Sequence, residues 1–214
     1  MSFRTGTALF ALMLFTYVPI AKAENFLQSA DVRQYIAEVS AEEGLDANYL
    51  ASLFVKISSQ QSILDAISKP AERTLTWKEY RPIFLKERRI VEGREFIDKH
   101  RALLERASDA YGVPVNVIAA IIGVETFYGR ITGKYGVLES LATLAFNYPP
   151  RAKFFKRELT EFLVLSSAEE WDTLNVRGSY AGAMGIPQFI SSSYRQYAVD
   201  FDGDGRRDLF NSTA

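Results

Sequence analysis

Residues 115–124 are apolar on nearly every side of the helix that they would form, and this segment runs directly into Glu125. A helix that is apolar all round is buried all round, so the segment predicts a buried helix with a carboxylate at its end. Burial raises the pKa of a carboxyl group, and the negative end of a helix dipole acts in the same direction. A carboxylic acid that stays protonated near neutral pH can act as a general acid in glycosidic cleavage. The alternative is a core glutamate bonded to backbone groups or to an arginine such as Arg130.

Helical periodicity also dominates the rest of the chain. Residues 31–43 carry apolar side chains at helical spacing and end at Gly44, and Asp46 suits the N-cap of a following helix. Strand signals are few. Further helices are expected at residues 140–146, at residues 151–165 and after Pro187. The chain therefore predicts a mainly helical fold.

One long helix is expected between Pro82 and Arg106. Apolar residues recur there at every seventh position, and charged residues fill the opposite face; the apolar positions are Ile83, Ile90, Ile97 and Leu104. Just before this stretch, Thr76 and Glu79 have the spacing of a capping box. Proline damages a helix interior, so the long helix is expected to begin close to Pro82.

The first residues have the features of an export signal. Arg4 precedes an apolar run at residues 8–20, and Ala21-Lys22-Ala23 fits the small-x-small cleavage pattern. A membrane-spanning helix needs about 20 apolar residues, so the run is short for one. We therefore expect residues 1–23 to be a signal peptide, with an uncleaved anchor or a buried helix as the alternative.

Composition removes several classes of chemistry. The chain has no cysteine, which excludes disulfides, thiolate metal sites and cysteine-linked lipid anchors. Its one histidine, His100, lies in a charged stretch and is expected at the surface, which makes a Ser-His-Asp mechanism improbable. With 25 basic and 26 acidic side chains, the chain has no overall field that would attract nucleic acid or an anionic membrane. Carboxylate, hydroxyl and amide chemistry is what remains.

A second dense segment is Ser179–Phe189. Small residues at 181, 182, 183 and 185 let the backbone approach something closely, and Ser179 and Gln188 offer polar groups. The segment favours a binding surface, with a tight helix-packing turn as the alternative.

A third segment resembles the opening of a calcium-binding loop. Asp200, Asp202 and Asp204 stand at positions 1, 3 and 5, a glycine stands at position 6, and Arg206 stands at position 7. Position 12, ordinarily a glutamate, is Asn211. We therefore expect a structural calcium site whose loop is incomplete in this chain and needs a ligand from beyond residue 214. The alternative is an acidic surface turn.

Together, these segments resemble the lytic murein transglycosylases of the membrane-bound B type, most strongly over residues 77–210. The similar motifs, in chain order, are Tyr111–Pro114, Ile121–Arg130, Leu141–Phe146, Tyr148–Arg151, Ser179–Phe189 and the loop that begins at Asp200. The resemblance implies a mainly α, lysozyme-like transglycosylase domain with few short strands. Residues 24–108 would form its helical N-terminal part, and residues 109–214 a catalytic core that ends in an EF-hand-like loop.

The resemblance also implies an activity. The family cleaves the MurNAc–GlcNAc bond of peptidoglycan without water and leaves 1,6-anhydromuramyl products. By motif position, Glu125 would be the sole catalytic acid and base, Ser179 would bind the N-acetyl group, and Gln188, Tyr80 and Arg151 would line the glycan groove. Calcium is the implied cofactor, with no organic cofactor. The implied partners are peptidoglycan glycan strands and proteins of cell-wall synthesis or remodelling.

The chain departs from the family pattern in two places. Members of the B type commonly carry a lipid-anchoring cysteine after the signal peptide, and its absence here implies a soluble periplasmic protein with no stable membrane anchor. The family also continues past the calcium loop, so a chain that ends at Ala214 is expected to be a C-terminally truncated form. Two other functions stay open: a non-catalytic peptidoglycan-binding remnant, and a calcium-dependent structural module with Glu125 as a core group.

Overall fold

Short helices make up most of the computed structural model, which describes residues 25–69 and 75–212. The expected signal peptide lies outside these residues. Two short strands, β1 (Tyr135–Gly136) and β2 (Arg177–Gly178), pair antiparallel. The helices are α1 (Ala30–Glu43), α2 (Ala47–Phe54), α3 (Gln61–Ser68), α4 (Trp77–Phe84), α5 (Glu87–Lys99), α6 (Arg101–Tyr111), α7 (Val115–Thr126), α8 (Val137–Asn147), α9 (Ala152–Ala168) and α10 (Ser191–Tyr197), with the 3-10 turns η1 (Phe26–Gln28) and η3 (Pro149–Arg151). The prediction of a mainly helical fold with few short strands is confirmed.

The first two helices begin and end where the sequence predicts. Gly44 closes α1 with a left-handed φ of 72°, which glycine adopts without steric cost. The Asp46 side chain accepts a hydrogen bond of 2.6 Å from the Tyr49 amide and so caps α2. The Tyr35 hydroxyl on α1 then lies 2.9 Å from Thr160 Oγ1 on α9, which ties this N-terminal pair to the core.

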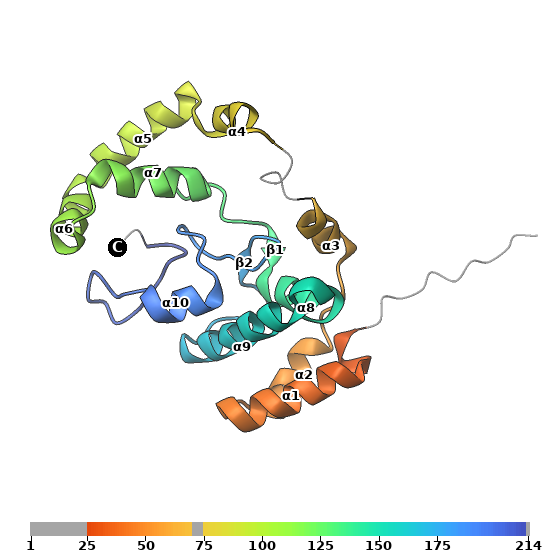
Figure 1. The fold of residues 1–214 in the computed structure, drawn as a ribbon. Helices are drawn as coiled ribbons and strands as arrows, with labels where there is room; N and C mark the ends of the chain where they lie inside the picture. Colours follow the sequence, from red (N-terminus) through yellow and green to blue (C-terminus); the bar gives the residue numbers. More distant parts are fainter. Residues whose placement is uncertain (1–24, 70–74, 213–214) are drawn as a thin grey trace, which may run out of the picture.

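The core lies around α8 and α9, which pack against each other (Figure 1). Their fully buried side chains interlock with α1, α2, α3 and α10; those from α8 and α9 are Val137, Leu138, Leu141, Leu144, Phe155, Leu159, Phe162 and Leu165. Burying a side chain of this size contributes roughly 1.5–3 kcal/mol. Helices α8 and α9 therefore form the centre of the core among the described residues.

The prediction of one long helix from Pro82 to Arg106 is wrong. The helix begins at Trp77, where the Thr76 amide donates to Glu79 Oε2 at 2.8 Å as the capping box predicts, and Pro82 lies inside this short α4. The chain breaks after α4 and again at His100, so that α5 and α6 both pack against α7. A straight helix could not place both segments on one neighbour.

The prediction that the segment ending at Glu125 is buried all round is also wrong. Helix α7 buries its small residues Ala119 and Gly123, whereas Val117, Ile121 and Val124 are exposed. A Cβ on Gly123 would lie 2.6 Å from Tyr128 Cζ, so this close packing requires glycine. Helices α5 and α6 pack against α7, whereas Ile121 on α7 remains 54% exposed.

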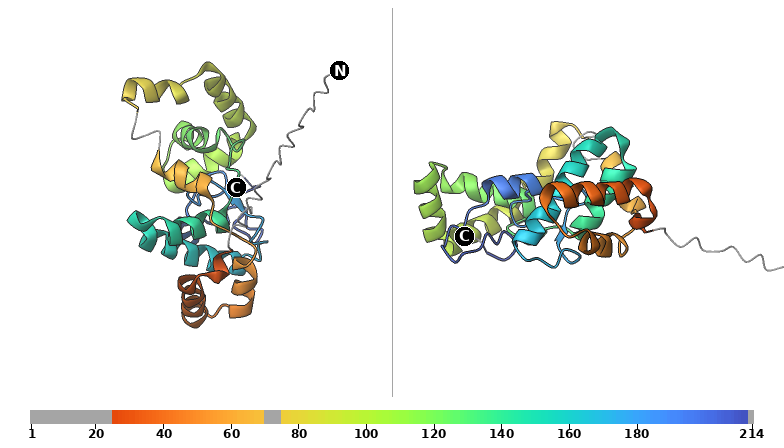
Figure 2. Two further views of the ribbon diagram at one scale, coloured as in Figure 1. Left: turned by 90° about the vertical axis from the view of Figure 1, so that its right-hand side faces the viewer. Right: turned by 90° about the horizontal axis from the view of Figure 1, so that it is seen from below.

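The helices form two groups with the C-terminal segment between them. Helices α4–α7 lie on one side, α1–α3 with α8 and α9 lie on the other, and the segment from β2 through α10 runs between them (Figures 1 and 2). Helix α6 runs through residues 108 and 109, where we place the boundary between the N-terminal part and the core; that division stays a prediction. Within the described ranges, no single helix has the length and apolarity to cross a membrane, although the bent pair α6 and α7 together meets that test.

Candidate active site

Glu125 is the next-to-last residue of α7, and its side chain is exposed. The expectation of a buried carboxylate is therefore wrong, because the outer face of α7 is open. In the described chain, no residue forms a hydrogen bond or ion pair with the Glu125 carboxylate. Arg130, its candidate partner, pairs instead with Glu92 at 2.7 Å. A carboxylate left free at a helix end is available to a ligand, which contradicts the alternative of a bonded core glutamate.

The backbone after Glu125 is strained. Phe127 and Tyr128 adopt φ angles of 52° and 61°, in the left-handed region that favours glycine, and Gly129 follows at 82°. Each non-glycine residue there costs roughly 1–2 kcal/mol. Such strain persists only where surrounding contacts hold it, and it clusters at functional sites.

Two sets of contacts hold this strained turn. The Tyr128 hydroxyl donates to the Arg89 carbonyl at 3.0 Å. The Phe127 ring lies among three guanidinium groups, with centroid distances of 5.4 Å to Arg88, 4.8 Å to Arg89 and 5.4 Å to Arg130. Helix α5 therefore fixes the end of α7 immediately beside Glu125.

Thr126 joins this turn to the glycine-rich segment. The Thr126 side chain is buried, and its hydroxyl donates to the Ile186 carbonyl at 2.9 Å and accepts from the Gly129 amide at 3.0 Å. The structure thus brings the end of α7 and the Ser179–Phe189 segment together, as a shared site requires.

Ser179 and Gln188 keep one polar function free each. Ser179 Oγ accepts from the amides of Ala181 (3.3 Å) and Ala183 (3.0 Å), which occupies its lone pairs and leaves its proton to donate. Gln188 Nε2 donates to the carbonyls of Thr132 (3.0 Å) and Gly185 (2.9 Å), which leaves Oε1 to accept. The segment therefore offers one donor and one acceptor to a ligand.

Tyr80 and Arg151 lie on other elements. Tyr80 is on α4, with its ring 5.1 Å from that of Phe84. Arg151 is exposed in η3, and its guanidinium lies 4.2 Å over the Phe154 ring. Among the described residues, neither Tyr80 nor Arg151 forms a hydrogen bond, ion pair or ring contact with Glu125, Ser179 or Gln188. Their place in a common groove stays a prediction.

The acidic loop is ordered by its first aspartate. Asp200 accepts hydrogen bonds from the amides of Gly205 (2.8 Å), Gly203 (2.7 Å) and Asp204 (3.1 Å). These bonds, led by the one from Gly205, lower the pKa of the Asp200 carboxyl. Carboxylate oxygens of Asp200, Asp202 and Asp204 all lie within 4.8 Å of one another.

This oxygen cluster fits the early positions of a calcium loop. The Arg206 amide donates to Asp204 Oδ1 at 2.9 Å, which leaves the Arg206 carbonyl for the seventh position. The side chain of Asn211, at position 12, donates to Asp208 Oδ2 at 3.2 Å. The described residues therefore place oxygen atoms where the opening ligands of such a loop would stand, and position 12 holds Asn211 in place of an acidic residue.

Backbone bonds connect the acidic loop to the end of α7. The Ile186 amide donates to the Leu209 carbonyl at 2.8 Å, while the Ile186 carbonyl accepts from Thr126. The buried Tyr194 hydroxyl also accepts from the Leu209 amide at 3.3 Å. A continuous set of hydrogen bonds therefore links the end of this loop to Thr126, beside Glu125.

A sequence model of the family described as transglycosylase SLT domain matches residues 28–214. The chain belongs to this transglycosylase family. Membrane-bound lytic murein transglycosylase B of Escherichia coli (strain K12) is 39% identical to it over 196 residues, 87% of this chain and 54% of that protein. The chain thus spans about half the length of this curated relative.

Solved structures of the family agree with the fold. Lytic transglycosylase SltB1 of Pseudomonas aeruginosa is 51% identical with a TM-score of 0.84, and the match covers 88% of this chain and 62% of that one. Slt35 of E. coli, solved in complex with calcium, is 39% identical with a TM-score of 0.82, covering 88% of this chain and 60% of that one. These matches confirm the family and the lysozyme-like fold predicted from the motifs.

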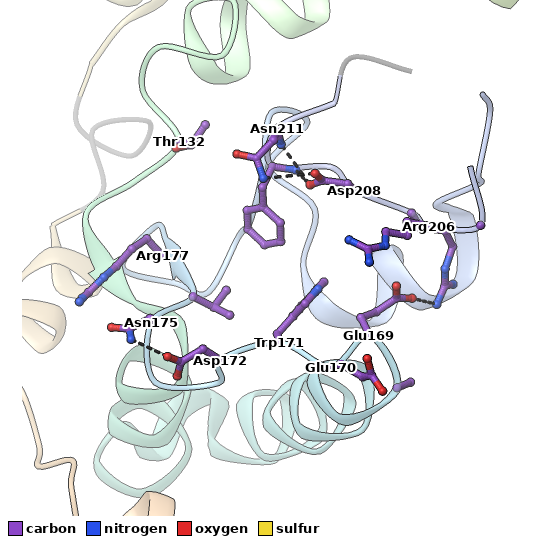
Figure 3. Close-up of a pocket in the computed structure, with 15 residues that line it drawn as sticks. Thr132, Glu169, Glu170, Trp171, Asp172, Asn175, Arg177, Arg206, Asp208 and Asn211 are labelled. Carbon is purple, nitrogen blue, oxygen red and sulfur yellow. Dashed lines mark hydrogen bonds and ion pairs between the residues drawn. The ribbon is translucent and has the colours of Figure 1, made fainter. Parts of the chain in front are cut away.

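Two cavities lie beside these groups, and Glu125 lines neither. One, of about 760 Å³, lies between the end of α9 and residues 205–211 (Figure 3). It contains Trp171 and Phe210, and also Thr132, whose carbonyl holds Gln188. The second, of about 470 Å³, contains Tyr128, Arg130 and His100. His100 is half-buried there, so the expectation of a surface histidine is only partly met; desolvation lowers its pKa.

Two features of this candidate site were not predicted from the sequence. The first is the bond from Thr126 to the Ile186 carbonyl, and the second is the ion pair between Glu92 and Arg130. Both join residues far apart in the chain, so no local spacing could reveal them. The position of Thr126 directly after Glu125 was the one available signal.

Proposed function

We propose that this chain is a lytic transglycosylase that cleaves the MurNAc–GlcNAc bond of peptidoglycan non-hydrolytically. The observation that carries the proposal is Glu125, an exposed and unpaired carboxylate at a strained helix end that is bonded to the Ser179–Phe189 segment. The similarity to a lytic murein transglycosylase of E. coli and to lytic transglycosylase SltB1 of P. aeruginosa supports the same reaction.

One carboxyl group suffices for this reaction. Protonated Glu125 donates its proton to the glycosidic oxygen as the bond from C1 to that oxygen breaks, and the N-acetyl oxygen of the muramyl residue bonds to C1. The Glu125 carboxylate then takes the proton of the muramyl C6 hydroxyl while O6 attacks C1 and displaces the N-acetyl oxygen. The product is a 1,6-anhydro ring, Glu125 is protonated again, and no water is consumed.

The other predicted site residues would position the glycan. The free proton of Ser179 suits the N-acetyl oxygen, and Oε1 of Gln188 suits a sugar hydroxyl or amide. Tyr80 offers an aromatic face to a sugar ring. The Arg151 guanidinium has no carboxylate partner among the residues described, so it can meet a carboxylate of the stem peptide.

The Glu125→Gln variant tests the chemistry, because the amide keeps the shape but carries no acidic proton. We expect it to abolish release of anhydromuropeptides from purified sacculi, measured by mass spectrometry, with the unfolding temperature unchanged. Glu43→Gln, which changes an exposed glutamate on α1, is the matched control and should release normally. Near-normal release by Glu125→Gln would overturn the assignment. Sacculus binding by the unaltered chain without release would favour the non-catalytic remnant.

We propose that calcium binds the Asp200, Asp202 and Asp204 carboxylates and the Arg206 carbonyl, as a structural ion. Calcium at about 100 times its Kd should stabilise the fold by about 2.7 kcal/mol. We therefore expect the unfolding temperature to rise with calcium and to fall with a chelator. Asp202→Asn should lose this response, whereas Asp109→Asn, on the exposed surface of α6, should keep it. An unfolding temperature indifferent to calcium would refute the site.

We further propose export to the periplasm through a signal peptide at residues 1–23, with no stable membrane anchor afterwards. The apolar run at residues 8–20 and the Ala21-Lys22-Ala23 pattern support this. Cell fractionation and N-terminal sequencing test it: a periplasmic protein that starts near Glu24 is expected, and recovery in the membrane fraction would contradict it.

A further inference from the structure

Helix α4 carries a row of aromatic rings on one face. Trp77, Tyr80 and Phe84 recur at helical spacing, with ring centroids 6.4 Å apart for the first pair and 5.1 Å apart for the second. Trp77 is 72% exposed, the most exposed large hydrophobic side chain among the described residues. Exposing a row of aromatic rings that ends in a tryptophan to water is unfavourable in free energy. Such an exposed apolar row is typical of a binding surface.

The row continues to the residues beside Glu125. The Arg89 guanidinium lies 5.4 Å from the Phe84 ring and 4.8 Å from the Phe127 ring, and it also donates to the Gly123 carbonyl. Phe127 follows Glu125 by two positions. Rings and guanidinium together therefore form an unbroken path from Trp77 to the end of α7, which we call the aromatic row: Trp77, Tyr80, Phe84, Arg89 and Phe127.

The chemistry of the aromatic row suits a glycan. Sugar rings combine apolar faces with hydroxyl edges, so they bind aromatic faces that have polar groups alongside. On α4 the exposed Lys78 and Arg81 flank the rings, and no described residue hydrogen-bonds the Tyr80 hydroxyl. A narrow row bordered by charges fits an extended saccharide better than it fits the broad apolar area of a protein partner.

We propose that Trp77 is the outer end of a glycan-binding row and holds a sugar residue distant from the bond cleaved at Glu125. This inference rests on the proposed function and extends the binding site along the bound glycan strand. Only strands long enough to reach from Glu125 to Trp77 would gain from the contact. Trp77 is then a length-selective binding residue.

The kinetic test uses the full chain and peptidoglycan glycan strands of graded length with their stem peptides removed. An aromatic contact is worth about 0.5–1.5 kcal/mol, so Trp77→Ala should raise KM for long strands by about twofold to twelvefold, with kcat unchanged. Short strands should show no difference. Trp77→Phe should retain most of the wild-type KM, and Tyr197→Ala, at an exposed site on α10, should match wild type throughout.

A binding test needs no turnover. The chain has two tryptophans, so Trp171→Phe combined with Glu125→Gln leaves Trp77 as the single reporter. We expect a saturable change in its fluorescence with long glycan strands and none with short ones. A response to phosphatidylglycerol vesicles with none to glycan would overturn the proposal in favour of a lipid surface.

The outcomes separate the two proposals. If wild type cleaves glycan strands and Trp77→Ala has the same KM as wild type for strands of every length, the inference fails while the proposed function holds. If Trp77→Ala raises KM by the same factor for glycan strands of every length, Trp77 is not an outer contact and the inference also fails. If wild type releases no product at all, the proposed function fails, and the fluorescence titration still decides whether the aromatic row binds glycan.

Discussion

Helices α7 and α8 are both strongly apolar, yet they occupy opposite environments. In α8 the large residues are fully buried, among them Leu138, Leu141 and Leu144. In α7 the buried residues are small, and Ile121 is 54% exposed. The apolar composition of a helix limits how much apolar side-chain surface it can bury. The elements that pack against the helix determine how much of that surface is buried.

The neighbours differ in kind. Helix α8 lies against the long helix α9 and against α3, which cover it from two directions. Helix α7 lies against α5 and α6, and Gly93 and Gly123 let the Tyr128 side chain fit between α5 and α7. One face of α7 is therefore tightly packed, and the other is open at the end that carries the proposed catalytic acid.

The largest effect expected from this difference is on stability. Leu144→Ala should lower the free energy of unfolding by about 2–5 kcal/mol, because it leaves a cavity in the α8–α9 core. Ile121→Ala on α7 should change it by about 0.5 kcal/mol or less, as for other surface substitutions. Urea denaturation of the two variants measures both values.

If Leu144→Ala and Ile121→Ala lowered the free energy of unfolding equally, the contrast between α7 and α8 would be wrong, since the outer face of α7 would then be covered in solution. Leu144→Val is a useful control: it removes less volume, so its loss should fall between those of the other two variants.

The sequence predicted those parts of the fold that local chemistry decides. Gly44 and Asp46 set the end of α1 and the start of α2 as expected, because caps act through neighbouring backbone groups. The break at His100 and the open face of α7 escaped prediction. Both depend on which elements pack against each other in the folded chain. The apolar periodicity of a segment does not reveal this, because it is the same whether or not another element covers the segment.

The candidate site divides in the same way. The acidic loop was predictable, because its ligands are local in sequence and the Asp200 carboxylate organises the loop through nearby amides. The sequence predicted a buried Glu125 and did not predict that it is exposed and unpaired, because that required knowing that Arg130 pairs with Glu92. The family resemblance singles out Glu125 by motif position, and its catalytic role stays a prediction, whereas the expectation of burial was wrong.

The packed face of α7 gives the next prediction. Gly123→Ala should lower the free energy of unfolding by about 1–3 kcal/mol, because its Cβ would lie 2.6 Å from Tyr128 Cζ and force that ring to move. In a Tyr128→Ala background the same change should stabilise by up to about 1 kcal/mol, since alanine is the better helix former. A double-mutant cycle by urea denaturation measures the difference. Equal effects in both backgrounds would show that Tyr128 is not what fills the space beside Gly123.

The smallest effect expected is on the titration of Tyr128. Desolvation between α5 and α7 is the main cause that raises the pKa of its hydroxyl, and the bond to the Arg89 carbonyl also requires the protonated form. A raised folded-state pKa contributes stability that is fully present below the ordinary tyrosine pKa of about 10, and that is lost as pH rises through the folded value. Above about pH 10, the free energy of unfolding of wild type should therefore fall more steeply with pH than that of Tyr128→Phe. Urea denaturation at each pH measures this free energy. Ultraviolet difference spectra of the two proteins isolate the ionisation of Tyr128. Parallel pH profiles for the two proteins would show that water reaches the packed face of α7 as freely as its open face.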